Sequence, residues 1–226
     1  MSGAVRRSFR HNDLDSLDVL LTRMRGSHRR ALICAEGAYS QDGDLPDLPG
    51  LVTLAEKHDA LLMIDEAHSI GVLGETGRGI GESQCVPGEA VNLWMGTLSK
   101  ALGSLGGYIA GSRDMIDYLR YSAPLYLFST GPSPANAAAA LAAIEVLRRE
   151  PKRVQDLHDR ADAFRQLARE AGLNIGVSRE SAVVPVIIGE WSRTVKISDE
   201  LFRRGFNAMP IGYPAVPRDD ARIRFF

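Results

Sequence analysis

The chain has 226 residues, of which 45% are hydrophobic and 24% charged, and its formal net charge is −1. This composition is typical of a globular protein, and it lacks the excess of basic residues common in nucleic-acid-binding domains. No signal-peptide-like stretch, no run of about 18 apolar residues and no Cys/His metal-ligand spacing occurs, so we expect a cytoplasmic protein without membrane span, nucleic-acid partner or bound metal.

The N-terminal half alternates between helical and strand patterns. Helices are predicted over 14–25, after the cap-type residues Asn12 and Asp13, and over 51–59. Strands are predicted over 31–36, over 60–65, at the start of 91–100 and over 106–112. Because each strand is a continuous apolar run, the pattern predicts a sheet covered on both faces, with Cys34 as a buried free thiol.

The composition becomes helical after residue 112. Helices are predicted over 113–122, 134–150 and 153–172, and Pro151 separates the last two. The alanine-rich 134–150 segment is predicted to be a buried helix. Short strands over 174–178 and 182–189, a helix near 195–204 and a final strand over 222–226 follow. We therefore predict a large domain over residues 1–145 and a smaller α+β domain over 146–226.

The stretch LLMIDEAHSI, residues 61–70, is compatible with two functional classes. An apolar strand ending in Asp-Glu-Ala-His occurs in DEAH-type helicases and in pyridoxal phosphate (PLP) enzymes. A helicase also needs the phosphate-binding loop GxxxxGK[ST]. None of the four lysines of the chain follows a glycine, so the helicase alternative is strongly disfavoured.

A PLP enzyme needs a lysine on a loop that follows a strand, so that the amine reaches the cofactor. Lys100 ends the segment VNLWMGTLSK and is flanked by the hydroxyls of Thr97 and Ser99. Glycines on both sides of this lysine suit a backbone that closes around a phosphate group. The alternative is that Lys100 is a solvated surface lysine. Because Lys100 follows a predicted buried strand, this alternative is less favoured.

Three stretches carry a resemblance to a known family: EGAYSQDGDLPDLPGLVTLAEKHDALLMIDEAHSIGVLGETGRG, GTLSKALGSLGGYIAGS and FSTGPSPANAAAALAAIEVL. They resemble the α-oxoamine synthases, which include 8-amino-7-oxononanoate synthase, 2-amino-3-ketobutyrate CoA ligase, 5-aminolevulinate synthase and serine palmitoyltransferase. The resemblance implies the aspartate aminotransferase-like fold of PLP-dependent transferases. That fold has a three-layer α/β/α large domain and a small C-terminal α+β domain, and both are expected to be partial here.

The resemblance also implies roles for single residues. Lys100 would form the Schiff base with PLP and later act as the general base. Asp65 would pair with the ring nitrogen, and His68 would bond the phenolic oxygen. Ser40 matches a family serine near that oxygen and the substrate, and Arg224 matches the arginine that binds the amino acid's carboxylate.

Three hydroxyl-bearing residues match the phosphate contacts of the family. Thr97 would bind the phosphate within its own subunit. Ser129 and Thr130 would reach the phosphate of a neighbouring subunit, although capping of the following helix is a serious alternative for both. His11, Glu66 and Arg78 are assigned structural roles, in holding loops or pairing charges.

The resemblance implies a condensation of an amino acid with an acyl thioester of CoA or of a carrier protein, usually with decarboxylation, in a homodimer. Compared with the family, about the first two-fifths is expected to be missing, including the histidine that stacks on the cofactor. Two alternatives stay open. The first is that the chain is a non-catalytic fragment or partner subunit. The second is an aminotransferase, which is disfavoured because aminotransferases commonly have an arginine where this chain has GSLGGY after Lys100.

Overall fold

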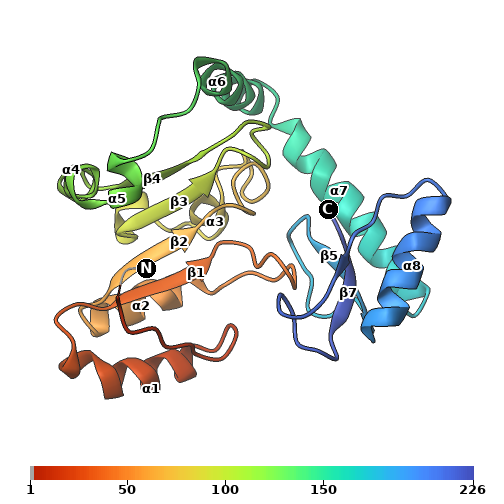
Figure 1. Cartoon of the computed structure of the whole chain (residues 1–226), viewed down its shortest axis with the longest axis horizontal. Helices are drawn as coiled ribbons and strands as arrows, with labels where there is room; N and C mark the ends of the chain where they lie inside the picture. The colour runs from red at the N-terminus through yellow and green to blue at the C-terminus, as the bar shows by residue number, and fades with distance from the viewer. Residues whose placement is uncertain (1–2) are drawn as a thin grey trace.

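The computed structural model describes residues 3–226 and contains two separate β-sheets, which lie side by side in Figure 1. The four-stranded sheet has the order β1 (Leu32–Glu36), β2 (Leu61–Asp65), β3 (Leu93–Thr97), β4 (Gly107–Gly111). Its first three strands are parallel, and β4 is antiparallel to β3. The second sheet has the antiparallel order β5 (Val184–Gly189), β7 (Ala221–Phe225), β6 (Pro210–Ile211).

Helices of very different length connect these strands. They are α1 (Leu14–Met24), α2 (Leu48–Lys57), α3 (Ile80–Ser83), α4 (Arg113–Ser122), α5 (Pro124–Leu127), α6 (Pro134–Arg149), α7 (Lys152–Glu170) and α8 (Trp191–Arg203). Two 3-10 turns, Arg25–Ser27 and Gly88–Ala90, complete the set. As predicted, Asp13 caps α1 by accepting a hydrogen bond from the Ser16 amide at 2.8 Å. No described helix combines the length and apolar character needed to cross a bilayer.

One face of the four-stranded sheet carries the main core. Helices α1 and α2 pack on it, and their buried leucines belong to the same hydrophobic cluster as Ile33 and Ala35 of β1 and Leu62 and Ile64 of β2. The amphipathic spacing of both helices explains this, because their apolar side chains fall on one stripe.

The opposite face of this sheet is only partly covered within residues 3–226, where Leu93 is buried but other apolar side chains are not. Leu32 is 48% exposed, Cys34 is also exposed, and Ile109 on β4 is 41% exposed. The prediction of a sheet covered on both faces, with a buried Cys34, is therefore wrong for the described residues. A run of apolar residues in a strand indicates that both of its faces are suited to burial. It does not indicate whether another element is present to cover each face.

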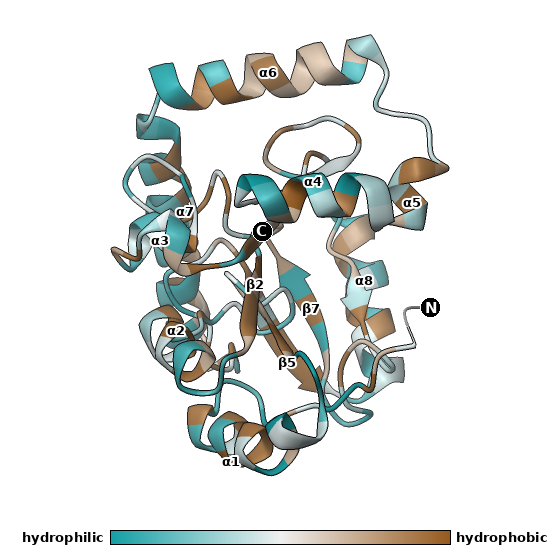
Figure 2. Ribbon diagram, turned by 90° about the vertical axis from the view of Figure 1, so that its left-hand side faces the viewer, coloured by the Kyte–Doolittle hydropathy of each residue, from teal (hydrophilic) through white to brown (hydrophobic). Residues whose placement is uncertain are grey.

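Two further predictions need correction. Helix α6 forms where predicted, but among its described residues Ala140 alone is buried, and Figures 1 and 2 show the helix along the periphery of the molecule. Residues 174–178 form no strand, because Gly176 adopts a positive φ of 59° and interrupts the extended backbone. The other predicted elements are confirmed with shifted ends. The predicted domain boundary at 145/146 falls inside α6 and stays a prediction.

Candidate active site

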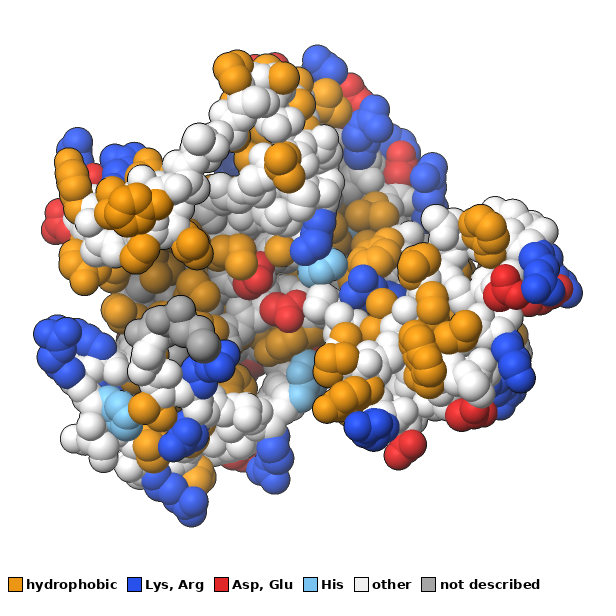
Figure 3. All heavy atoms as spheres, in the orientation of Figure 1, with side chains coloured by type: hydrophobic (Ala, Val, Ile, Leu, Met, Phe, Trp, Pro, Cys, Tyr) orange, Lys and Arg blue, Asp and Glu red, His pale blue; other side chains and the backbone are white. Residues whose placement is uncertain are grey.

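The candidate site is built on the carboxyl ends of the three parallel strands. Glu36 ends β1 and pairs in register with Asp65, which ends β2, while Thr97 ends β3. Ligands of open α/β sheets bind outside these strand ends, where loops carry the polar groups. Figure 3 shows acidic, basic and histidine side chains gathered in the hollow between the two sheet units.

The turn after β2 holds Asp65 and His68 on one rigid unit. The Asp65 carboxylate accepts a hydrogen bond from the Ala67 amide at 2.8 Å. The Glu66 side chain is only 2% exposed and accepts hydrogen bonds from the Ser69 hydroxyl and the Ile80 amide. Burial raises the pKa of Glu66. The Glu66 carboxylate thus holds the turn through these hydrogen bonds, which agrees with the structural role predicted for Glu66.

His68 is the point at which three predicted residues meet. Its ring is stacked on Phe226, with centroids 5.8 Å apart and planes 10° apart. Partial burial is the main cause that lowers the pKa of His68, and the positive charges of Lys100 and Arg224 also lower it, against the opposing effect of Asp65; together they bring it to about 4. Residues from β2, from the β3–β4 loop and from β7 therefore lie within electrostatic reach of one imidazole.

Lys100 lies on a closed loop between β3 and β4. The Leu98 amide donates to the Gly106 carbonyl at 2.9 Å, and the Gly103 amide donates to the Lys100 carbonyl at 2.9 Å. Gly103 and Gly106 have φ of 55° and 109°, a backbone conformation that other residues rarely adopt. Lys100 is exposed, and within residues 3–226 no carboxylate lies within ion-pair distance of it. Its amine is therefore available to a ligand.

The hydroxyl of Thr97 lies at the start of the same loop. It is 2.8 Å from the Ser99 hydroxyl and 3.2 Å from the Gly106 carbonyl oxygen, to which it can donate. A phosphate bound here would meet two neighbouring hydroxyls on a glycine-rich turn.

Arg224 reaches the site from the second sheet. Its Nη1 donates to the Ser40 carbonyl at 2.7 Å, and its guanidinium lies 4.5 Å from the ring centroid of Phe226. Its Nε is buried and has no hydrogen-bond partner among the described residues. An unpaired buried donor costs about 1–3 kcal/mol, so this atom is an obvious place for an anionic ligand. Ser40 itself is tied to Glu36 through its amide at 2.9 Å.

Ser129 and Thr130 are not brought to this cluster. Both are exposed after α5, and the Ser129 hydroxyl lies 3.5 Å from the Tyr126 carbonyl of the preceding turn. In the described chain neither residue bonds to the groups around His68. Their predicted role toward a neighbouring subunit stays a prediction.

The donor set fits PLP. The free amine of Lys100 matches the aldehyde of PLP, and the Asp65 carboxylate at a strand end matches the ring nitrogen. The uncharged His68 imidazole matches the phenolic oxygen, and two neighbouring hydroxyls match the phosphate. The unpaired Nε of Arg224 supplies a further donor for an anion near the same imidazole. No cation site is needed to account for these groups.

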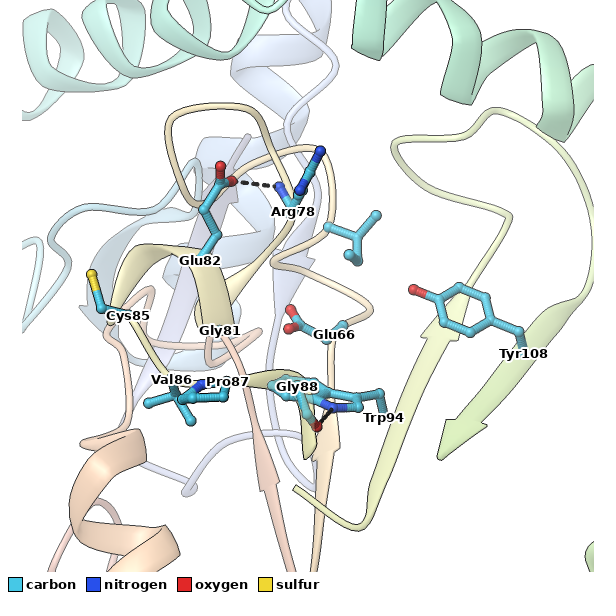
Figure 4. Close-up of a pocket in the computed structure, with 11 residues that line it drawn as sticks. Glu66, Arg78, Gly81, Glu82, Cys85, Val86, Pro87, Gly88, Trp94 and Tyr108 are labelled. Atoms are coloured by element: carbon cyan, nitrogen blue, oxygen red, sulfur yellow. Dashed lines mark hydrogen bonds between the residues drawn. The ribbon is translucent and has the colours of Figure 1, made fainter. Parts of the chain in front are cut away.

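A separate cavity of about 640 Å³ lies beside Glu66, Trp94 and Tyr108 (Figure 4). Trp94 pairs with Ile64, so its side chain is on the sheet face opposite Asp65. The cavity is therefore distinct from the candidate site.

Sequence reasoning missed Phe226 and Arg222 near the site, because their contacts join segments far apart in the chain.

His68 is expected to titrate near pH 4, well below an ordinary histidine. The unfolded chain would take up this proton near pH 6.5, so folding stability should fall as the pH is lowered from about 6.5 to about 4. The imidazole Cε1–H signal, assigned with His68→Gln by NMR, measures this directly. A midpoint near 6.5 would contradict the buried, cation-flanked position described above.

Comparison with known proteins agrees with this geometry. The sequence model of the family described as aminotransferase class I and II matches residues 1–225. An 8-amino-7-oxononanoate synthase from Petrotoga mobilis is 44% identical over 225 residues, which are 99% of this chain and 57% of that protein. The chain thus spans just over half the length of the curated relatives it matches.

Solved structures give the same result. Serine palmitoyltransferase from Sphingomonas wittichii has a TM-score of 0.89 at 30% identity and covers 96% of this chain, which in turn covers 54% of that protein. A structure described as SPT with PLP has a TM-score of 0.89 at 29% identity and the same two coverages. The predicted resemblance to α-oxoamine synthases and the partial aspartate aminotransferase-like fold are confirmed. The chain belongs to the aminotransferase class I and II family.

Proposed function

We propose that the chain forms the PLP-binding core of an α-oxoamine synthase. Such an enzyme joins an amino acid to an acyl thioester, releases the thiol of CoA or of a carrier protein, and usually loses the amino acid's carboxyl group as CO₂. The observation that carries the proposal is the cluster around His68: Phe226 stacks on its ring and lies 4.5 Å from the Arg224 guanidinium, and the charges of Lys100 and Asp65 are near enough to act on the imidazole. Because the chain spans about half of its relatives, the complete reaction belongs to the proposal.

PLP, when bound, supplies a conjugated ring that accepts the electron pair left on the amino acid's Cα. The Lys100 amine would bind the aldehyde carbon of the cofactor and, once displaced by the substrate's amino group, would take the Cα proton. The Asp65 carboxylate would hold a proton on the ring nitrogen. The His68 ring would donate its single N–H to the phenolic oxygen.

The remaining residues would orient the two ends of the ligands. Thr97 would donate its hydroxyl to the phosphate, and Ser40 would lie beside the phenolic oxygen and the substrate. Arg224 would bind the substrate's carboxylate through its unpaired Nε and one Nη, the two-point geometry that guanidinium and carboxylate groups favour. Ser129 and Thr130 would contact the phosphate of a second subunit.

Amino-acid binding tests this function. The chain loaded with PLP is titrated with glycine, L-alanine and L-serine while its absorbance is recorded. We expect a saturable change whose dissociation constant rises at least about tenfold in Arg224→Met, because a hydrogen bond to a charged group contributes about 1.5–3 kcal/mol. Arg218→Met, which removes an exposed guanidinium over Tyr213, is the matched control and should bind like the unaltered chain.

The reaction class is tested by adding an acyl-CoA to the same sample. Release of free thiol that depends on the amino acid supports the condensation. Formation of a 2-oxo acid without thiol release would support an aminotransferase instead. Equal affinities in Arg224→Met and Arg218→Met would contradict the role proposed for Arg224.

The proposal includes a homodimer in the cytoplasm. Support for the dimer comes from α5 and the turn that follows it, where Leu125 and Phe128 are each 89% exposed just before Ser129. Large exposed apolar patches commonly mark protein contact sites. Sedimentation of the purified chain measures its mass, for which one protomer contributes 24.6 kDa.

A further inference from the structure

The segment 40–42 forms the junction between the two sheets, and Arg222 is its main anchor. The Arg222 side chain is 3% exposed, and its Nη1 lies 2.6 Å from the Asp42 carboxylate. The same Nη1 donates to the Gln41 carbonyl at 3.1 Å, and Nε donates to the Asp220 carbonyl at 3.0 Å. One guanidinium thus binds two consecutive residues of the segment.

Arg222 and Arg224 act on the same stretch of backbone. They are two positions apart on β7, so their side chains lie on the same face of the strand. Arg224 donates to the Ser40 carbonyl, and Arg222 donates to the Gln41 carbonyl. The two arginines therefore bind adjacent peptide units, and only Arg224 keeps a buried nitrogen without a partner.

The charges around Asp42 explain why an arginine is needed here. The ligand atoms of His11, Asp42 and Asp44 all lie within 4.8 Å of one another, so two carboxylates crowd this corner. The His11 ring is bonded to Asp44 at 2.9 Å, and Arg222 is the cation on Asp42. Removing Arg222 would leave Asp42 facing Asp44 without its counter-charge, and segment 40–42 would lose its contact with β7.

We propose that Arg222 is a positioning residue for substrate binding. The ion pair of Arg222 with Asp42 holds β7 against segment 40–42. Because Arg224 lies on the same strand and binds the same segment, this contact fixes the Arg224 guanidinium so that the Arg224 Nε faces the ligand. The inference rests on the proposed role of Arg224 in binding the amino acid's carboxylate. It adds that the affinity for this group is set by a second arginine that does not touch the substrate.

The test uses Asp42→Asn, which keeps the shape of the side chain and removes its charge, and Asp42→Glu, which restores the charge. Asp199→Asn is the matched control, because Asp199 forms an exposed ion pair within α8, with Arg203 at 2.6 Å. In the PLP-loaded chain we expect Asp42→Asn to weaken L-alanine and L-serine binding by about tenfold. The cofactor band should be unchanged, and Asp42→Glu should recover part of the affinity.

A second readout does not depend on the cofactor. The Nε–H signal of Arg224, assigned in ¹⁵N-arginine-labelled chain by its loss in Arg224→Met, reports the surroundings of this nitrogen. We expect it to shift in Asp42→Asn and to stay in place in Asp199→Asn. If Asp42→Asn fails to fold, Arg222→Lys serves instead, because a lysine cannot bind Gln41 and Asp42 with one planar fork.

The outcomes separate the two proposals. An unmoved Arg224 signal together with unaltered affinity in Asp42→Asn would overturn the positioning role of Arg222. A shifted signal with unaltered affinity would overturn it as well, because the displacement would have no effect on binding. If Arg224→Met itself binds amino acids like the unaltered chain, the role of Arg224 in the proposed function fails first.

Discussion

Gly43→Ala is expected to destabilise the chain by about 2–5 kcal/mol, one of the two largest effects we anticipate. Gly43 has a φ of 72°, which costs an alanine about 1–2 kcal/mol. A Cβ on Gly43 would clash with the carbonyl oxygen of Val183, so the backbone of the second sheet unit would have to move. Forcing extra atoms into a packed interior adds about 1–3 kcal/mol.

The same substitution would also disturb the junction beside the site. The Gly43 carbonyl accepts hydrogen bonds from the Ser181 hydroxyl at 2.8 Å and from the Arg179 amide at 3.1 Å. Both bonds hold the segment next to Asp42, so amino-acid binding should weaken together with stability.

Gly205→Ala is the matched control for this prediction. Gly205 also has a positive φ, of 90°, but nothing lies within 4 Å of the Cβ it would gain. Its cost should be confined to the backbone conformation, about 1–2 kcal/mol. Urea unfolding of both variants gives the comparison. Equal losses of stability would show that the close approach of Gly43 to Val183 is not a tight contact in solution.

The local order of elements follows from the sequence where the physical signals are local. Leucine spacing with an aspartate cap predicted α1, and Pro151 predicted the break between α6 and α7. These features depend on backbone hydrogen bonds and side chains within a few residues, so no knowledge of distant contacts was required.

Exposure was predicted less well, because it depends on which elements meet. The apolar runs of β1 and β4 suggested burial on both faces, yet Leu32 and Ile109 are exposed. Helix α6 is alanine-rich and was predicted to be buried, but small side chains permit burial without requiring it. Such outcomes are set by the packing partners available to a face, and periodicity does not contain that information.

The candidate site divides in the same way. Asp65 and Lys100 were predicted from motifs at single strand ends, and the role of His68 came from resemblance; the structure brings His68 within electrostatic reach of the other two. The role of Arg224 came only from resemblance. The stacking of Phe226 on His68 and the ion pair of Arg222 with Asp42 join segments more than 150 positions apart, which no local pattern could indicate.

Lys100→Ala is expected to abolish the covalent binding of PLP, the second of the two largest effects. The chain has four lysines, and Lys100 is the one near the His68 imidazole, on a loop that leaves its amine without an ion-pair partner among the described residues. Without this amine no other primary amine of the site can reach the cofactor's aldehyde carbon.

Lys196→Ala is the matched control. Lys196 is also exposed, but it lies on α8 in the second sheet unit. Its loss removes one lysine from the chain and leaves the β3–β4 loop intact, so any binding of PLP to surface amines should fall equally in both variants.

The binding of PLP by Lys100 is measured by the absorbance spectrum of the purified chain with PLP, recorded for the unaltered protein, Lys100→Ala and Lys196→Ala. We predict a band at about 420 nm that persists in Lys196→Ala and disappears in Lys100→Ala, with all three proteins folded by circular dichroism. A band of equal strength in Lys100→Ala, or no band in any of the folded proteins, would contradict the assignment of this site to PLP chemistry.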